Sequence, residues 1–220
     1  MKLEVPFFSN TPDNFHCFQA ALRMVLAYYL PARPYNWEEL DRVTAHTANY
    51  TWPSAGLRHC GSLGFNLRVI EDFDYQRFCE EGYGYLFELS GKEVAEDQRT
   101  NSDLAQEMRC AKELVAALPI ERRIPSRKDI IECLENEMLV VCNVNSCALD
   151  GKEGYNGHFV VAIGANDLGV WLHNPGFPPR QNEFIKWNRF EPAWSYPDDR
   201  ARNIMGFQLL TDKFRVKPAL

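Results

Sequence analysis

The sequence predicts an α+β fold, in which helices come early in the chain and the strands of an antiparallel sheet come late. Three observations support this prediction. Between Cys17 and Tyr29, apolar residues recur at three- and four-residue spacing, which is the pattern of one buried helical face. The segment from Gly91 to Pro119 is rich in Glu, Ala, Gln, Lys and Arg and has few β-branched residues. From Met138 onward, apolar runs separated by turn residues predict strands.

The individual elements are placed by their end signals and periodicity. Asp13 or Asn14 is a suitable N-cap for the first helix, which Pro31 ends, and Asn36 is a suitable N-cap for the second. Ser126 and Asp129 have the spacing of a capping box at the start of a later helix. We expect strands at residues 3–8, 65–71, 138–145, 159–164, 170–173 and 204–210, and helices at residues 17–29, 37–43, 53–63, 75–81, 102–118, 126–136 and within 184–194.

The chain has 220 residues, which suits one domain spanning residues 1–220. Within it, the helical stretch of about residues 91–136 is expected to be an insertion that covers one side of the sheet. The hydrophobic share of 45% is enough for a sizeable core.

Charge and hydropathy exclude two classes of partner. The net charge is −6 and no basic stripe is present, so we expect no nucleic-acid partner. The start of the chain has no apolar signal core, and no window approaches the roughly 18 apolar residues of a membrane helix. Together with seven scattered cysteines, an odd number, this predicts a cytoplasmic protein without a membrane partner.

Three residues in a fixed order carry the functional prediction. Cys17 begins a helix, His158 begins an apolar strand after a Gly-rich loop, and Asn174 ends the next strand. Each alone has an ordinary structural explanation, since cysteines often only pack and Asn-Pro-Gly is common in turns. Together they have the chain order of a papain-like Cys-His-Asn site. We expect a Cys17 thiolate, stabilised by imidazolium at His158, to attack a carbonyl carbon, and Asn174 to orient the imidazole.

The motifs around these residues resemble those of the C39-like peptidases of the papain-like superfamily. The matching segments are VPFFSN at residues 5–10, Cys17 with AALRMVL at residues 20–26, GHFVV at residues 157–161 and HNPG at residues 173–176. The resemblance spans both ends of the chain and skips the helical middle. It implies a papain-like fold with a nucleophile at Cys17, a base at His158 and an orienting residue at Asn174.

The oxyanion hole needs two donors, for which we expect the backbone N–H of Cys17 and the side-chain amide of Asn10. The family commonly has Gln where Asn10 stands. It commonly has Gly after the nucleophile, where the larger Phe18 reshapes the cleft.

Three function classes follow from this site. The first is thiol-dependent hydrolysis of a peptide or amide bond through an acyl-enzyme, which makes the chain a cysteine peptidase or amidase. The second is acyl transfer to an amine or thiol through the same acyl-enzyme. The third is a non-catalytic module that binds a peptide or carrier. No cofactor or metal is expected, because Cys142 and Cys147 lack a Cys-x-x-Cys or His pair and no phosphate-binding glycine loop is present.

Overall fold

The computed structural model describes residues 2–209. Its helices are α1 (Cys17–Tyr29), α2 (Trp37–Thr44), α3 (Ser54–Ser62), α4 (Tyr75–Glu81), α5 (Tyr83–Asn101), α6 (Leu104–Ala117), α7 (Arg127–Glu135), α8 (Ser146–Leu149) and α9 (Trp187–Trp194), with a 3₁₀ turn at Asp199–Ala201. Its strands are β1 (Phe65–Glu71), β2 (Ile120–Glu121), β3 (Leu139–Asn145), β4 (Gly157–Asn166), β5 (Gly169–Asn174), β6 (Arg180–Lys186) and β7 (Asn203–Leu209).

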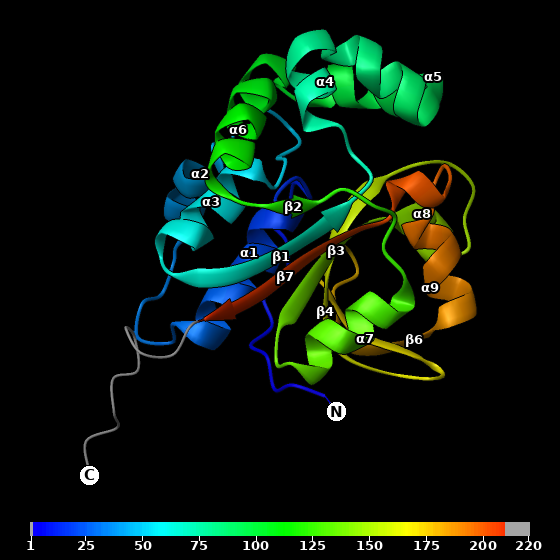
Figure 1. Ribbon diagram of the computed structural model, residues 1–220. Helices are drawn as coiled ribbons and strands as arrows, with labels where there is room; N and C mark the ends of the chain where they lie inside the picture. Colours follow the sequence, from blue (N-terminus) through cyan, green and yellow to red (C-terminus); the bar gives the residue numbers. More distant parts are fainter. Residues whose placement is uncertain (1, 210–220) are drawn as a thin grey trace.

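The strands form one sheet in the order β2-β1-β7-β3-β4-β5-β6. All neighbouring pairs are antiparallel except the short pair of β1 and β2. The N-terminal helix α1 packs against this sheet, chiefly on β4. The chain therefore has the predicted α+β fold, with the helix that Cys17 begins resting on a mainly antiparallel sheet (Figure 1).

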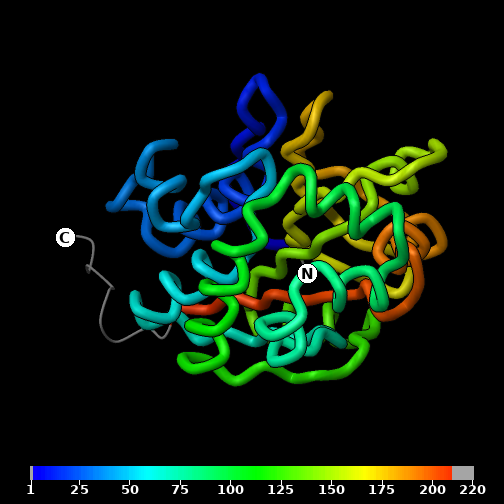
Figure 2. The backbone as a smooth tube through the Cα atoms, turned by 90° about the horizontal axis from the view of Figure 1, so that it is seen from above, coloured from blue at the N-terminus to red at the C-terminus, as the bar shows by residue number. Residues whose placement is uncertain are grey.

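Helices cover both faces of the sheet. Side chains alternate along each strand, so apolar residues point to both faces and form two clusters that the helices bury. Val141 and Val161 face the cluster that contains α1, whereas Val140 and Val160 face the cluster that contains α7 and α9. In the perpendicular view, β7 (red) runs between the blue N-terminal segments and the green segment that leads to α7 (Figure 2). The buried β3 lies at the centre of both clusters, as its continuous apolar run predicts.

From the sequence we predicted that the helical middle of the chain covers one side of the sheet. The structure differs from this prediction. The parts of the helical middle divide between the two faces. Ala95 of α5 and Leu114 of α6 belong to the cluster around α1, while Ile130 of α7 belongs to the opposite cluster. The strand β2, which pairs with β1, carries the chain from one face to the other. The sequence pattern could not show this crossing, because a two-residue strand has no periodicity.

Two local predictions at the N-terminus were wrong. Residues 3–8 form no strand; the chain there is tied to β4 by a bridge between Lys2 and Gly164 and by a hydrogen bond from Leu3 N to Ile163 O. Helix α1 is preceded by His16, whose side chain makes no capping bond, rather than by an Asp13 or Asn14 cap. By contrast, Asn36 caps α2 as predicted. None of the helices within residues 2–209 is both long and apolar enough to cross a membrane.

Candidate active site

A cleft of about 440 Å³ opens beside the first turn of α1 and the adjoining ends of β3 and β4. Cys17 and His158, which are 141 positions apart in the chain, both line it. Aromatic side chains from several parts of the chain form much of its wall. They are Phe15, Phe18, Tyr50, Trp52, Phe73, Tyr155, Phe159, Trp194 and Tyr196. The fold therefore places the predicted nucleophile and base at one largely aromatic cleft.

His158 and Asn174 are joined by a hydrogen bond of 2.8 Å between the imidazole Nε2 and the amide Oδ1. The backbone N–H of Gly176 donates to the same Oδ1 at 3.0 Å, which identifies this atom as the oxygen. Nε2 must then carry the proton, and Nδ1 keeps its lone pair. Gly176 is required by the close packing, because a Cβ there would lie 3.0 Å from Nε2 of His158. In this tautomer Nδ1 of His158 can accept a proton, as a general base must.

The thiol of Cys17 lies among backbone donors at the helix start. Burial raises the pKa of Cys17, and the nearby backbone N–H groups of Phe159, Phe18 and Cys17 offset only part of this effect.

Burial also lowers the pKa of His158 to about 4, and its bond to Asn174 offsets only part of this effect. The imidazole is therefore neutral at pH 7. Burial thus favours the uncharged form of both side chains, and the thiolate–imidazolium pair stays a prediction.

Phe18, the bulky residue after the nucleophile, is accommodated by a glycine. Its ring is 1% exposed and packs on Phe159 with 5.0 Å between centroids. A Cβ at Gly56 would lie only 2.7 Å from the Phe18 ring, so the ring occupies space that a side chain at position 56 would need. Phe18 thus forms part of the cleft wall.

Asn10, the predicted oxyanion donor, is held in the turn that precedes α1. Its Oδ1 accepts from the backbone N–H groups of Thr11 and His16, both at 2.9 Å, which fixes the orientation of the amide. Its Nδ2 donates to Oδ1 of Asn14 at 3.0 Å. Asn10 is 4% exposed and does not line the cleft, whereas Asn14 does.

Sequence reasoning considered Asn14 only as a helix cap and so missed its place at the cleft. Asn14 adopts a left-handed backbone conformation with φ of 65°, one that Asn tolerates better than most residues. Because its Oδ1 accepts from Asn10, the Nδ2 of Asn14 remains a donor at the cleft. A short Pro-Asp-Asn turn before a helix indicates such a backbone conformation, but it does not indicate where the Asn14 side chain points.

The remaining candidate histidines lie outside the cleft. His173, next to Asn174, is fully buried and bonds through Nε2 to Val5 O at 3.0 Å. His16, next to Cys17, does not line the cleft either. Neighbouring positions in the sequence thus face different surroundings, as alternation along a strand predicts for His173.

Comparisons with known proteins were made on sequence and on structure. No family model matches the chain, and no curated protein matches it. Among solved structures, the peptidase domain of Streptococcus ComA, a bifunctional ABC transporter of a quorum-sensing pathway, is 12% identical with a TM-score of 0.49, covering 92% of this chain and 96% of that one. A C39-like peptidase from Bacillus anthracis is 16% identical with a TM-score of 0.49, covering 94% of this chain and 98% of that one. The second is described as a C39-like peptidase, the family that the sequence motifs resemble.

Proposed function

We propose that this protein hydrolyses a peptide or amide bond through an acyl-enzyme on Cys17. The observation that carries the proposal is the orientation of His158, whose Nε2–H is fixed by Asn174 so that Nδ1 can accept a proton at the cleft shared with Cys17. As the sulfur attacks the carbonyl carbon, its proton moves to Nδ1 of His158. The imidazolium then gives that proton to the leaving amine, and the C–N bond breaks. Water, deprotonated by His158, releases the acid and restores the thiol.

The oxyanion hole in this proposal uses the backbone N–H of Cys17 and the side-chain Nδ2 of Asn14. Asn10, which we expected to donate directly, has its Nδ2 directed to Asn14. It is instead a positioning residue that fixes the amide orientation of Asn14. Negative charge that develops on the carbonyl oxygen would then meet two donors at the start of α1, where the helix dipole is also favourable.

Asn14→Ala is expected to lower kcat by about 10²–10³-fold with little change in KM, because it removes one oxyanion donor. Asn10→Asp should lower kcat less, since it keeps the acceptor oxygens for Thr11 and His16 but loses the bond to Asn14. Steady-state kinetics on the same substrate separate the two roles. A larger loss of kcat in Asn10→Asp than in Asn14→Ala would return the direct donor role to Asn10.

Acyl transfer is the second candidate, and one observation favours it. His158 exposes only 4% of its surface, and several aromatic side chains line the cleft, which limits the access of water to the imidazole. An amine or thiol acceptor that enters the cleft with its own apolar groups could then compete with water for the acyl-enzyme. The two functions share every step up to acylation and differ only in the attacking group.

Intact-mass spectrometry can test the proposal and separate these classes. The protein is incubated with a mixture of acetylated peptide amides, with and without an added primary amine. We expect an acyl adduct on the wild-type chain that decays in water and is absent in Cys17→Ala. Cys147→Ala is the matched control, because Cys147 is half-buried but does not line the cleft. Decay only with the amine present would establish transfer.

No adduct in the wild type, together with slow alkylation of Cys17 by iodoacetamide up to pH 8, would contradict both enzymatic classes. The raised pKa of Cys17 supports this alternative, since a thiol that never ionises is inert. The cleft would then serve as a binding site for a peptide or carrier, and equilibrium binding of the same peptides would be unchanged in Cys17→Ala.

A further inference from the structure

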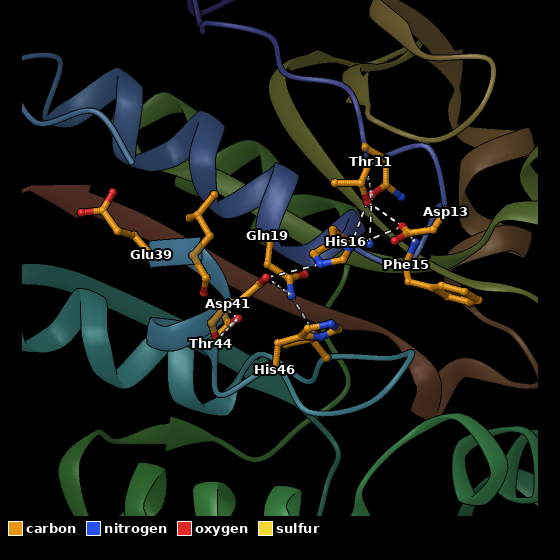
Figure 3. A network of polar contacts seen from close by, with 12 residues as sticks. Thr11, Asp13, Phe15, His16, Gln19, Glu39, Asp41, Thr44 and His46 are labelled. Carbon is orange, nitrogen blue, oxygen red and sulfur yellow. Dashed lines mark hydrogen bonds and ion pairs between the residues drawn. The ribbon is translucent and has the colours of Figure 1, made fainter. Parts of the chain in front are cut away.

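Two histidines and an aspartate meet between α1 and α2, outside the cleft. His16 precedes α1, Asp41 lies in α2, and His46 lies in the segment between α2 and α3. One ring nitrogen from each histidine and one carboxylate oxygen lie within 4.8 Å of one another. Figure 3 shows these side chains converging beside Gln19. None of the three lines the cleft, so the proposed catalysis does not account for them.

One ring nitrogen of each histidine already contacts a threonine hydroxyl. Nδ1 of His16 lies 2.8 Å from Oγ1 of Thr11, and Nδ1 of His46 lies 2.6 Å from Oγ1 of Thr51. Each imidazole is left with Nε2 for a further partner. In metal sites, a ligating histidine usually makes such a bond through its other nitrogen, which fixes the ring and its tautomer. Nε2 of His16 already lies 3.3 Å from Oδ1 of Asp41.

The buried side chain of Gln19 contacts two of the residues around the cluster. Its Nε2 donates to Oγ1 of Thr51 at 2.9 Å and lies 3.5 Å from Oδ1 of Asp41. Gln19 is 0% exposed, and its Oε1 has no hydrogen-bond partner among the described residues. Burying an amide oxygen without a hydrogen-bond partner costs free energy. Here Gln19 holds Thr51 and Asp41 on two sides of the cluster.

We propose that His16, Asp41 and His46 bind a divalent transition-metal ion of the zinc type. Two imidazoles and one carboxylate are ligands that suit zinc and do not suit calcium or magnesium, which prefer oxygen alone. Ligand atoms at about 2.0–2.1 Å from a tetrahedral zinc ion lie roughly 3.3 Å apart. The contact of His16 with Asp41 has this spacing, and the ring nitrogen of His46 lies within 4.8 Å of both ligand atoms. Asp41 is 33% exposed, which leaves a fourth position for water.

Such an ion would join three segments that secondary structure leaves separate. It would tie the residue directly before Cys17 to α2 and to the segment after it. The expected role is to stabilise the start of the nucleophile helix. This inference does not depend on the proposed function, because it concerns binding and stability rather than turnover.

Titration of the full, metal-free chain with Co²⁺ and Zn²⁺ tests the site. We expect one equivalent of Co²⁺ to bind with visible d–d bands and without the near-ultraviolet charge-transfer band of a thiolate ligand. Zn²⁺ should displace it and raise Tm by about 5–10 °C when free Zn²⁺ is about 100 times its Kd. Absence of binding by the wild-type chain would overturn the proposal.

Variants assign the ligands. His46→Ala and the isosteric Asp41→Asn should each weaken Zn²⁺ binding by at least about 100-fold, and Thr51→Val by about 10–100-fold, as expected for loss of an outer partner. His59→Ala is the matched control, because this histidine bonds to Tyr35 and takes no part in the cluster. Circular dichroism of each metal-free variant shows that it is folded. A thiolate band, or full affinity in Asp41→Asn, would place the ion elsewhere and overturn the proposal.

Discussion

His158→Gln is expected to lower kcat at pH 7 by about 10²–10⁴-fold, the usual contribution of a general acid–base group. Nδ1 of His158 is the nitrogen left free by the bond to Asn174, and glutamine offers no basic atom there. Because burial lowers the pKa of His158 to about 4, wild-type turnover should hold from neutral pH down to an acidic limb near pH 4. The residual activity of the variant should lack that limb. Steady-state rates between pH 3.5 and 8 measure both effects.

Stability gives a second readout that is independent of any substrate. The pKa of His158 falls from 6.5 in the unfolded chain to about 4 in the folded one, so between these values the unfolded state binds more protons. Stability must therefore fall as pH falls through this window, by up to about 3 kcal/mol at 1.36 kcal/mol per unit. His158→Gln removes this contribution. The free energy of unfolding of the variant, relative to that of the wild type, should therefore rise steadily as the pH falls from 6.5 to 4.

His59→Gln serves as the activity control, since His59 is partly exposed and lies outside the cleft. It should leave kcat unchanged. If His158→Gln retains full turnover at pH 7 while its stability shows the expected gain in acid, His158 is a buried histidine without a chemical role. An acidic limb near pH 6 in the wild type would mean that substrate or solvent relieves the burial of the ring.

The sequence predicted the elements with strong periodicity and clear ends. The apolar face of residues 17–29 predicted α1 with the bounds that the structure has, and the alternation of residues 65–71 predicted β1. It did not predict β6, because residues 180–186 have an exposed, mixed pattern that only pairing with β5 turns into a strand. It also did not predict the start of α5 at Tyr83, since Gly82, Gly84 and Gly91 weaken the helical signal.

The sequence indicated which residues come together near the cleft, but not how deeply they are buried or how the turn before α1 is bonded. Cys17, His158 and Asn174 stand in motif-like contexts, and the bond between His158 and Asn174 needs only neighbouring strands. The raised pKa of Cys17 and the lowered pKa of His158 result from burial, which depends on side chains far away in the sequence. The role of Asn10 likewise depends on a bond to Asn14, four residues away, within an irregular turn.

Glu107→Gln is expected to stabilise the protein at alkaline pH by up to about 3 kcal/mol. Glu107 lies in α6 and is only 5% exposed, and burial raises its pKa to about 7, although the backbone N–H of Trp52 donates to its Oε1. Between pH 4.5 and 7 the folded state thus keeps a proton that the unfolded state has lost. Stability therefore falls as pH rises through this window, which is the opposite of the contribution from His158.

A neutral glutamine has no such dependence, so the advantage of Glu107→Gln should be near zero at pH 4.5 and should grow until about pH 7. Its Oε1 can still accept from Trp52, which keeps this part of the cleft wall in place. The new Nε2 needs an acceptor, and a missing one would lower the gain at every pH by the same amount. Urea unfolding of variant and wild type from pH 4.5 to 8 measures the difference. Glu113→Gln, at an exposed position of the same helix, is the control, and parallel pH curves for Glu107→Gln and wild type would show that Glu107 is already ionised in the folded protein.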